Sequence, residues 1–339
     1  MNEALNILLI RLKSIGDVIF TLPAVGCVRD NFPASRIAFL VSKELASLLQ
    51  GFAQVDEVIP LDRAPFQRRQ LKAICAEALG LVRRLRAGHF SLVVDFQGYG
   101  ETAAMTWLTR APQRWGSVYR PSRRWAYTQW AARNDHLHQA DWNLSLVTQC
   151  GLKAGAVRNE FRLPDSARQS AREFFAAHGL DPTQATLFIQ PFTSSAEKDW
   201  PLEKSLALGR HWKSQGLQVI FGGGPAERAA LEPARQAGFV TSAGVPLLTT
   251  AGLVELSTLA VGGVTGLLHL AVAMQKRVVM LIGYAEDEPG FPYQHRDWAV
   301  VAGHAMPAAS IPVEAVIDAT ARAFAEAGLA LPPRPAVPA

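Results

Sequence analysis

The chain has 339 residues, which is enough for about two domains of roughly 150 residues each. With 49% hydrophobic and 19% charged residues, its composition is that of a globular protein and excludes a disordered or fibrous chain. A formal net charge of +5 favours anionic partners, which leaves nucleic acid, nucleotide sugars, phosphorylated glycans and anionic membranes open.

The cysteines and the first residues argue against secretion. Cys27, Cys75 and Cys150 are widely separated and odd in number, so they form neither a disulfide framework nor a metal-ligand spacing. The opening MNEALN has no basic residue, and the apolar run after it is too short for a signal peptide. We therefore expect a protein of the reducing cytoplasm.

The first half alternates strand-like and helix-like patterns, which is typical of βαβ units around a mainly parallel sheet. A linker is predicted at residues 151–166, where glycine and proline interrupt a stretch of mixed polarity. We predict strands at residues 7–10, 36–41, 57–61 and 92–95, and a longer helix over 135–150.

After the linker the alternation restarts, so we predict a domain of residues 1–160, a second domain of residues 161–330 and a flexible tail of residues 331–339. Residues 251–274 carry only Glu255 and His269 as potentially charged groups. Three glycines interrupt them, which predicts a helix, a buried strand and a second helix instead of a membrane span. The other predicted elements are helices over 165–178, 202–215, 226–237 and 312–327, and strands at 186–190, 217–221, 277–282 and 298–301.

The segment after the first strand carries the most informative acidic residue. The apolar run at residues 7–10 leads through a glycine turn into the helical spacing of Val18, Leu22 and Val25. Asp17 therefore stands near the carboxyl end of a buried parallel strand, where open α/β sheets bind their ligands. This fragment alone leaves two interpretations of Asp17 open, a helix N-cap and a catalytic carboxylate.

A loop after a strand in the second half, residues 190–201, offers groups that suit a phosphate. Thr193 and Ser194 can donate hydroxyl hydrogens, and Lys198 supplies a compact positive charge. A solvated loop that ends at a Trp-Pro helix start explains the same residues.

Two further loops also follow strands, where backbone N–H groups and a helix dipole attract an anion. Residues 221–227 form a glycine turn that is neither a dinucleotide fingerprint nor a P-loop. In residues 264–269, Thr265 and Gly266 would cap a helix and let a phosphate approach closely. His269 lies one turn further on, where a buried core histidine is the competing interpretation.

Residues 102–134 contain six arginines and no acidic residue, and aromatic residues alternate with these arginines. Such a surface suits single-stranded nucleic acid, a phosphorylated lipid-linked sugar or an interfacial membrane. A helix hairpin with a basic face also explains the pattern. The residues are Arg110, Arg114, Arg120, Arg123, Arg124 and Arg133, with Trp107, Trp115, Tyr119, Trp125, Tyr127 and Trp130.

Five motifs in a fixed order carry a resemblance to a known family. They are R-L-K-S-I-G-D-V-I-F-T-L-P at residues 11–23, V-D-F-Q-G at 94–98, K-D-W-P at 198–201, G-G-P-A-E at 223–227 and T-G-L-L-H-L-A at 265–271. Over almost its whole length the chain resembles the lipopolysaccharide heptosyltransferases of glycosyltransferase family nine. The resemblance implies an α/β fold of GT-B architecture, with two Rossmann-like, doubly wound parallel-sheet domains facing a cleft. The first domain would bind the acceptor and the second ADP-heptose.

The resemblance also implies roles for individual residues. Asp17 corresponds to the general base of the family, and no metal ion or cofactor is expected. The expected partners are an ADP-sugar and an anionic lipid-linked glycan, with peripheral contact at the inner face of the cytoplasmic membrane and no nucleic acid. The donor residues are Thr193, Ser194, Lys198, Glu227, Thr265, Gly266 and His269, and the acceptor residues are Lys13, Ser14, Gln97, Arg120, Arg123 and Arg124.

One position departs from the family. The family usually has D-T-G-L-x-H, and this chain has Val264 where that Asp stands. A valine cannot accept a hydrogen bond from a sugar hydroxyl, and losing such a contact costs about 1–3 kcal/mol. The departure leaves three outcomes open: another sugar nucleotide, low activity, or compensation by Glu286 or Asp287.

The leading hypothesis is therefore an inverting, metal-independent glycosyltransferase. Two alternatives stay open: a catalytically idle relative that binds a nucleotide sugar or glycan, and a nucleotide-sugar epimerase. Nucleic-acid binding ranks last, since no recognised nucleic-acid module accompanies the basic stretch.

Overall fold

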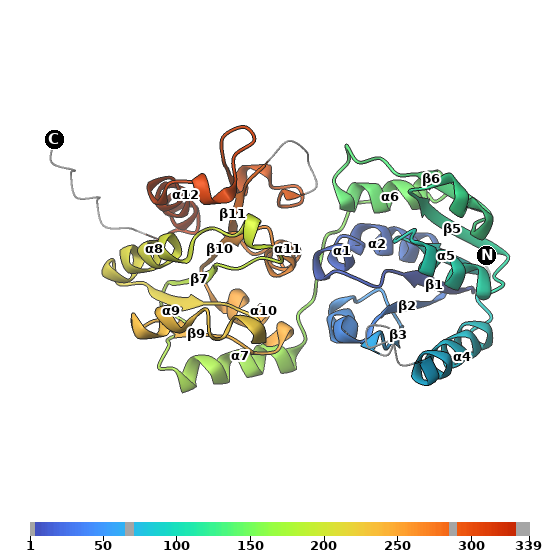
Figure 1. The fold of residues 1–339 in the computed structure, drawn as a ribbon, viewed down its shortest axis with the longest axis horizontal. Helices are drawn as coiled ribbons and strands as arrows, with labels where there is room; N and C mark the ends of the chain where they lie inside the picture. The colour runs from blue at the N-terminus through green and yellow to red at the C-terminus, as the bar shows by residue number, and fades with distance from the viewer. Residues whose placement is uncertain (1–3, 65–70, 285–289, 330–339) are drawn as a thin grey trace. The chain divides into compact units, whose positions relative to one another are not determined.

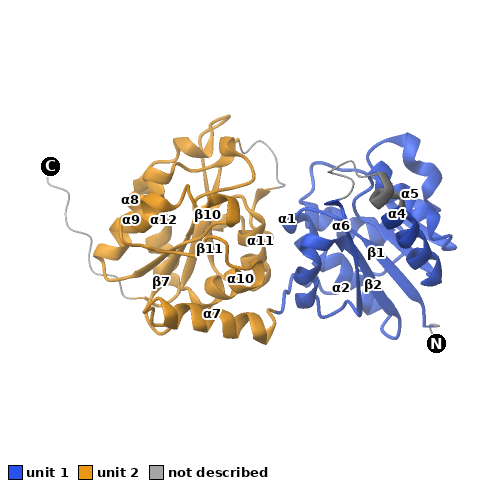
Figure 2. Cartoon of the chain, turned by 60° about the horizontal axis from the view of Figure 1, so that its bottom comes forward, with its two compact units in different colours: residues 1–162 blue, residues 163–339 orange. Residues whose placement is uncertain are grey.

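The computed structural model describes residues 4–64, 71–284 and 290–329. The chain divides into two compact units, Met1–Arg162 (unit 1) and Leu163–Ala339 (unit 2) (Figure 2). Glu286, Asp287 and the predicted tail at 331–339 lie outside the described residues.

Unit 1 contains a sheet of six parallel strands with helices on both faces (Figure 1). The strand order is β3-β2-β1-β4-β5-β6, so the chain proceeds from β1 to one side and returns to the other side at β4. In this register Leu8 of β1 pairs with Ala38 and with Val93. The strands are β1 (Asn6–Ile10), β2 (Arg36–Ser42), β3 (Glu57–Leu61), β4 (Leu92–Asp95), β5 (Gln113–Val118) and β6 (Gln129–Ala132).

The helices of unit 1 pack in pairs, α2 with α6 and α4 with α5. Leu8 and Ile10 of β1 share a core cluster with Leu81 and Leu85 of α4, because alternate residues of a strand point to opposite faces of the sheet. The helices are α1 (Ile15–Ile19), α2 (Leu22–Asn31), α4 (Leu71–Ala87), α5 (Gly100–Leu108) and α6 (Gln139–Gln149), with 3₁₀ segments η1 (Lys43–Gly51) and η2 (Pro121–Ala126).

The helix-hairpin interpretation of the basic segment is wrong, because this segment contains β5, η2 and β6. Arg114 and Gly116 interrupt any apolar run in β5, and β6 is an edge strand in which Gln129 and Trp130 are exposed. The helix predicted over 135–150 begins only at Gln139.

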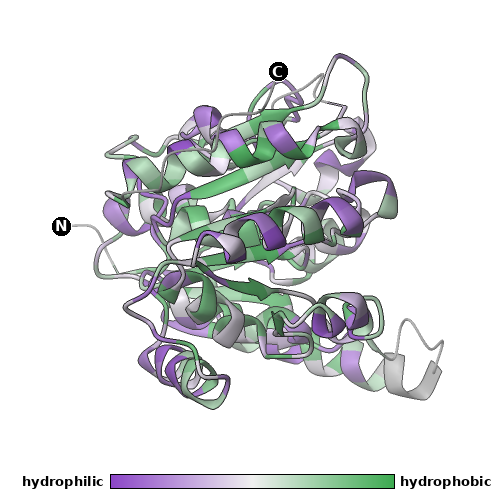
Figure 3. Ribbon diagram, turned by 90° about the vertical axis from the view of Figure 1, so that its left-hand side faces the viewer, coloured by the Kyte–Doolittle hydropathy of each residue, from purple (hydrophilic) through white to green (hydrophobic). Residues whose placement is uncertain are grey.

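Unit 2 repeats the topology of unit 1, with the strand order β12-β11-β10-β7-β8-β9 and every pairing parallel. Here the order reverses between β7 and β10. Figure 3 shows the strands of the sheets in green, the colour of hydrophobic residues. The strands are β7 (Thr186–Gln190), β8 (Gln218–Phe221), β9 (Val240–Thr241), β10 (Leu259–Gly263), β11 (Val278–Ile282) and β12 (Ala299–Val301).

The predicted helix over 226–237 is wrong in extent, because only 232–236 of it is helical and a 3₁₀ turn precedes it. Pro233 explains the late start, since proline lacks the N–H that a helix interior requires. The helices of unit 2 are α7 (Asp165–Ala177), α8 (Leu202–Ser214), α9 (Glu232–Gln236), α10 (Leu247–Leu256), α11 (Gly266–Ala273) and α12 (Val313–Glu326), with η3 (Ala196–Lys198), η4 (Pro225–Glu227), η6 (Arg296–Trp298) and η7 (Ala308–Ser310).

The interpretation of residues 251–274 is confirmed, since they contain the end of α10, all of β10 and all of α11. Within the described ranges, the helices are all too short or too polar to cross a bilayer.

Candidate active site

The candidate site in unit 1 lies where the strand order reverses. β1 and β4 pair side by side, and the loops at residues 11–14 and 96–99 follow their carboxyl ends. Open α/β sheets bind ligands at this position, because the two loops diverge there and leave backbone groups accessible. Asp17, Lys13, Ser14 and Gln97 all belong to these loops or to the helix that follows β1.

Asp17 is half-buried and lies in the first turn of α1. The interpretation of Asp17 as the helix N-cap is wrong, because Ser14 is the N-cap and Asp17 is the third residue of the helix. Its Oδ2 accepts from the Ser14 backbone N–H at 2.9 Å and from the Ser14 hydroxyl at 3.2 Å. Oδ2 also lies 2.9 Å from Nη2 of Arg11. The Asp17 side chain nevertheless remains 34% exposed. Among the described residues, the side-chain hydrogen bonds to Asp17 reach Oδ2, and none reaches Oδ1.

Arg11 is the residue that holds Asp17 in place, and sequence reasoning did not single it out. It is only 5% exposed. Its Nη1 donates to the Phe96 carbonyl at 2.9 Å and its Nε to the Lys13 carbonyl at 3.1 Å. One planar guanidinium therefore links Asp17 to both loops, which a flexible ammonium could not do.

The loop after β4 is held together by a second acidic residue, Asp95, which sequence reasoning did not single out. Asp95 is fully buried, and its Oδ1 accepts from the backbone N–H groups of Gln97 and Gly98, each at 2.9 Å. Its Oδ2 accepts from the Tyr127 hydroxyl at 2.7 Å. Gly98 has φ +65°, and a Cβ there would lie 1.9 Å from the Ser117 carbonyl oxygen, so this turn requires glycine.

Burial is the largest influence on the pKa values of Asp95 and Tyr127. It raises the pKa of Asp95, while the hydrogen bonds from Gly98, Tyr127 and Gln97 act in the opposite direction. Burial, followed by the neighbouring Asp95, raises the pKa of the Tyr127 hydroxyl, which keeps it protonated as a donor.

Gln97 lies inside the loop and is only 1% exposed. Its Oε1 accepts from the Leu12 backbone N–H at 2.8 Å, and its Nε2 lies 3.4 Å from Oε1 of Glu101. Arg63 reaches the same Glu101 carboxylate at 3.4 Å. Gln97 therefore supports the loop. Glu101 and Arg63 also contact this loop network, and no motif in the sequence indicated them.

The predicted acceptor residues are brought only partly together. Lys13 and Ser14 are exposed at the edge beside Asp17. Arg123 reaches this edge, since its Nη1 donates to the Gly98 carbonyl at 2.7 Å. Arg120 is exposed, whereas the guanidinium of Arg124 instead lies over the ring of Trp130 in β6, 5.0 Å from its centroid.

In unit 2 the strand order reverses between β7 and β10, and the loop after β7 lies against the last residue of β10. A Cβ at Gly263 would lie 2.6 Å from Cγ2 of Thr193 and 3.2 Å from the Lys198 carbonyl oxygen. The absence of a side chain at Gly263 therefore lets the loop after β7 lie against the end of β10.

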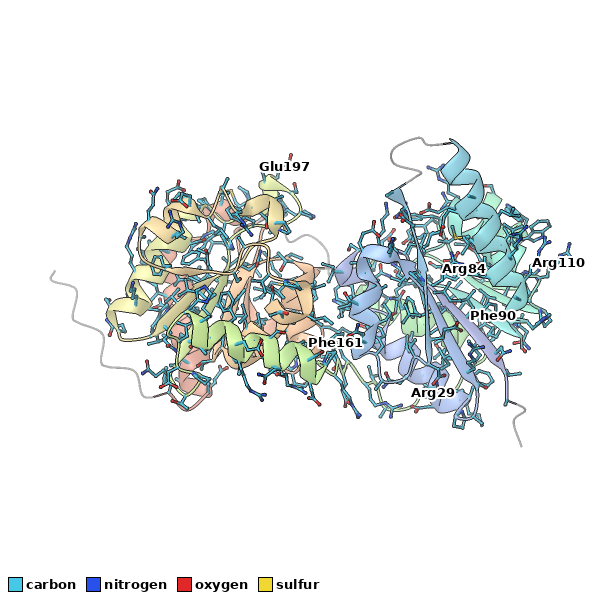
Figure 4. The ribbon with its side chains drawn as sticks, turned by 90° about the horizontal axis from the view of Figure 1, so that it is seen from below. Arg29, Arg84, Phe90, Arg110, Phe161 and Glu197 are labelled. Atoms are coloured by element: carbon cyan, nitrogen blue, oxygen red, sulfur yellow. The ribbon has the colours of Figure 1, made fainter. Side chains whose placement is uncertain are left out.

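The loop after β7 is ordered by its own polar groups. The Thr193 backbone N–H donates to Oδ1 of Asp199 at 2.6 Å, and the Thr193 hydroxyl donates to the Ser195 carbonyl at 2.8 Å. Ser194 and Lys198 are exposed. Glu197, beside Lys198 in η3, projects from unit 2 in Figure 4.

The loop after β10 leads into α11. The Thr265 hydroxyl accepts from the Leu268 backbone N–H at 3.3 Å, so Thr265 is the N-cap, and Gly266 is the first helical residue. His269 is 5% exposed. Val264 is half-buried, and its methyl groups lie 3.6 and 3.7 Å from the position of a Cβ at Gly290.

Glu227 closes the glycine turn after β8. The Gly224 backbone N–H donates to its Oε2, and the side chain stays half-buried. The described ranges contain no group of three or more His, Cys, Asp or Glu residues that could hold a metal ion.

Comparison with known proteins identifies the family. A family model described as glycosyltransferase family 9 (heptosyltransferase) matches residues 78–314. The chain belongs to this family. The fold is accordingly of GT-B type, and the protein is a glycosyltransferase.

Similar proteins share low sequence identity over most of their length. The chain is 26% identical to lipopolysaccharide heptosyltransferase 1 of Pseudomonas aeruginosa, over 85% of this chain and 80% of that protein. It is 21% identical to lipopolysaccharide heptosyltransferase 1 of Escherichia coli K12, over 84% and 89%. The match to the lipopolysaccharide core heptosyltransferase OpsX of Haemophilus influenzae is 22% identical and spans 66% of this chain and 61% of that protein.

Solved structures show the same fold. A family 9 glycosyltransferase from Veillonella parvula has a TM-score of 0.84 at 22% identity, covering 94% of this chain and 97% of that one. The Escherichia coli heptosyltransferase WaaC with ADP has a TM-score of 0.77 at 20% identity, covering 94% and 99%. A UDP-GlcNAc 2-epimerase from Methanocaldococcus jannaschii, with a TM-score of 0.52 at 11% identity, is more distant in fold.

Proposed function

We propose that this glycosyltransferase transfers heptose, or a related sugar, from an ADP-sugar to a lipopolysaccharide core or another lipid-linked glycan, with inversion at the anomeric carbon and without a metal ion. The observation that carries this proposal is the half-exposed carboxylate of Asp17 at the strand-order reversal of unit 1, with Oδ1 available. The relatives named lipopolysaccharide heptosyltransferase 1 support the substrate class.

In the proposed reaction the acceptor hydroxyl attacks the anomeric carbon from the face opposite the ADP. The new C–O bond forms as the bond from that carbon to the β-phosphate oxygen breaks, and the electron pair leaves with the ADP. Oδ1 of Asp17 receives the hydroxyl proton. Arg11 keeps the carboxylate oriented, because three of its nitrogens contact Asp17 and the carbonyls of Phe96 and Lys13.

Unit 2 would bind the donor through the loops that follow β7 and β10. Negative charge grows on the leaving diphosphate, and Lys198 together with the Ser194 hydroxyl would stabilise it. Thr193, whose hydroxyl donates to the Ser195 carbonyl, would hold the loop in shape. Thr265 and Gly266 begin α11, whose first N–H groups and helix dipole attract the same charge. Glu227 would contact the nucleoside. His269 is buried, so its proposed part is to shape the loop from within.

Lys13 and Ser14, exposed beside Asp17, would contact the acceptor, and Arg120 and Arg123 would pair with its anionic groups. Arg124 would join them only by turning away from the ring of Trp130. Gln97 would act by holding the loop, because it is bonded within it. We place the protein in the cytoplasm, at the inner face of the cytoplasmic membrane, where a lipid-linked acceptor is accessible.

A turnover assay tests this proposal. The protein is incubated with ADP-heptose and with lipopolysaccharide lacking core heptose, and free ADP and the glycolipid mass are measured. We expect ADP release that depends on the acceptor, together with a glycolipid heavier by one heptose. ADP release without any change in glycolipid mass would contradict sugar transfer.

Val264 supports a second candidate function, a relative that binds the nucleotide sugar but does not transfer it. Its apolar side chain cannot bond to a donor hydroxyl or pair with a cation. Calorimetric titration with ADP-heptose separates the two candidates when it is run beside the turnover assay. Binding without product favours the idle relative, and turnover excludes it.

A further inference from the structure

Unit 1 exposes large aromatic rings along one side. Among the described residues, five of the ten exposed large hydrophobic side chains fall between residues 99 and 130. Trp107 of α5 is 52% exposed and Trp125 of η2 is 57% exposed. Their rings touch edge to face, with centroids 6.0 Å apart. Exposed tryptophans gathered in this way mark an interaction surface, because leaving such area in water is unfavourable.

Positive charge surrounds these rings. A surface pocket of about 270 Å³ beside them is lined by Arg86, Trp107, Leu108, Arg110 and Arg114. Figure 4 shows Arg110 at one edge of unit 1. Arg86 and Arg110 are exposed, and neither has an ion-pair partner within the part of the chain that the structure describes. Two guanidinium groups are therefore available to anions.

The surface begins far from the candidate active site and extends toward it. α5 starts after the carboxyl end of β4 and finishes at Leu108, just before β5 begins, so Trp107 and Arg110 lie near the amino ends of the strands. η2 returns along α5 to the start of β6. Arg123 of η2 bonds to Gly98 at the carboxyl edge, so one face connects the two edges.

We propose that this face, defined by Arg86, Trp107, Arg110 and Trp125 and called here the α5–η2 face, binds the surface of an anionic phospholipid bilayer. Tryptophan rings settle at headgroup depth, and arginine pairs with lipid phosphate. The edge-to-face contact of Trp107 and Trp125 suits insertion between lipids better than the parallel stacking of successive bases, so nucleic acid is the weaker partner. This proposal rests on the proposed function in one respect, because the proposed function supplies the lipid-linked acceptor that would lie beside Arg123.

Vesicle co-sedimentation of the full chain tests the proposal without any catalytic readout. The probes are phosphatidylcholine vesicles with and without about one third phosphatidylglycerol. We expect binding only to the anionic vesicles, weakened by added salt. Arg110→Gln should lower the vesicle affinity about fivefold, and Trp107→Ala with Trp125→Ala by at least as much.

Matched variants outside the face serve as controls. Met306→Ala removes an apolar side chain of unit 2 that is 46% exposed, and Arg172→Gln removes an exposed arginine of α7. Both should bind vesicles like the unmodified chain. Because Trp107 and Trp125 are half-exposed, circular dichroism should show an unchanged fold in their variants, and Arg110→Gln gives an independent reading.

Three results would overturn the proposal: no binding to anionic vesicles, equal losses in the control variants, or release of the protein from vesicles by a single-stranded oligonucleotide that binds it more tightly. Sugar transfer by a chain that does not bind vesicles would reject this surface and keep the proposed function. Vesicle binding by a chain that releases no ADP would support this surface and reject the proposed function.

Discussion

Replacing Arg11 with lysine should separate the positioning of Asp17 from the stability of unit 1. The lysine keeps the positive charge beside Asp17, but its single ammonium cannot reach all three partners that the guanidinium contacts. The Phe96 carbonyl, which lies in a fully buried residue, is expected to lose its donor. We therefore expect Asp17 to keep its charge and lose its fixed orientation.

The magnitude follows from these contacts. A hydrogen bond from a charged group contributes about 1.5–3 kcal/mol, and leaving a buried acceptor unpaired costs a similar amount. Losing the bond to the Phe96 carbonyl fully and the bond to the Lys13 carbonyl in part should lower the free energy of unfolding by about 2–4 kcal/mol. A catalytic group displaced by about 1 Å costs on the order of 10²-fold in rate, so kcat should fall by about that factor.

Arg29→Lys is the matched control. Arg29, labelled in Figure 4, donates to the carbonyls of Ser35 at 2.6 Å and Gln54 at 2.8 Å, and pairs with Asp56 at 2.5 Å. Its Nη1 also donates to the Pro33 carbonyl at 3.3 Å, so Arg29 has one partner more than Arg11. It belongs to the same unit and lies on α2, away from Asp17. Urea unfolding gives the stability of both variants, and steady-state kinetics gives kcat and the donor KM.

Both lysine variants should lose stability, and only Arg11→Lys should lose kcat, with the donor KM unchanged because the donor residues belong to unit 2. Equal kcat values for the two variants would refute the positioning role. A loss confined to the donor KM would also refute it.

Three other changes test further parts of the account. Burial raises the pKa of Asp95 above 3.8, so the folded chain retains a proton that the unfolded chain has lost, and stability should fall as pH rises from about 3.8 through the folded-state pKa. Asp95→Asn should remove this slope in urea unfolding measured from about pH 4 to about pH 7, and an unchanged slope would assign it to another group. Gly263→Ala should raise the donor KM and cost about 1–3 kcal/mol of stability, since its methyl group would displace the loop after β7; a variant with an unchanged KM would show that this loop does not bind the donor. Val264→Asp should lower the KM for ADP-heptose if the pocket still fits that donor, and no change in KM would mean that the pocket serves another sugar.

The sequence was most informative where strands are fully buried. The apolar runs at 7–10 and 186–190 predict β1 and β7 closely, because a strand in the middle of a parallel sheet is covered on both faces. β5 and β6 were missed since arginine, glycine and exposed edge residues break the apolar pattern there. Local periodicity does not show which strands lie at an edge.

For the site, the sequence indicated the loops but not their supports. Asp17 and Lys198 were predicted as site residues because each follows a predicted strand, and their roles stay predictions. The network of Arg11, Asp95 and Tyr127 depends on contacts between residues as far as 85 positions apart, which no local pattern records. The N-cap interpretation of Asp17 was wrong, since Ser14 is the N-cap of α1. The Asp17 carboxylate accepts from the Ser14 backbone N–H and remains 34% exposed.

The most direct test of the central claim is the single-turnover rate of Asp17→Asn with ADP-heptose and an acceptor. Asparagine keeps a side-chain oxygen that can accept from the Ser14 backbone N–H, so α1 should persist while the proton acceptor is lost. We predict that the transfer rate falls by about 10²–10⁴-fold and that ADP-heptose still binds with unchanged affinity. Transfer by Asp17→Asn at the rate of the unmodified chain would contradict the assignment of the base.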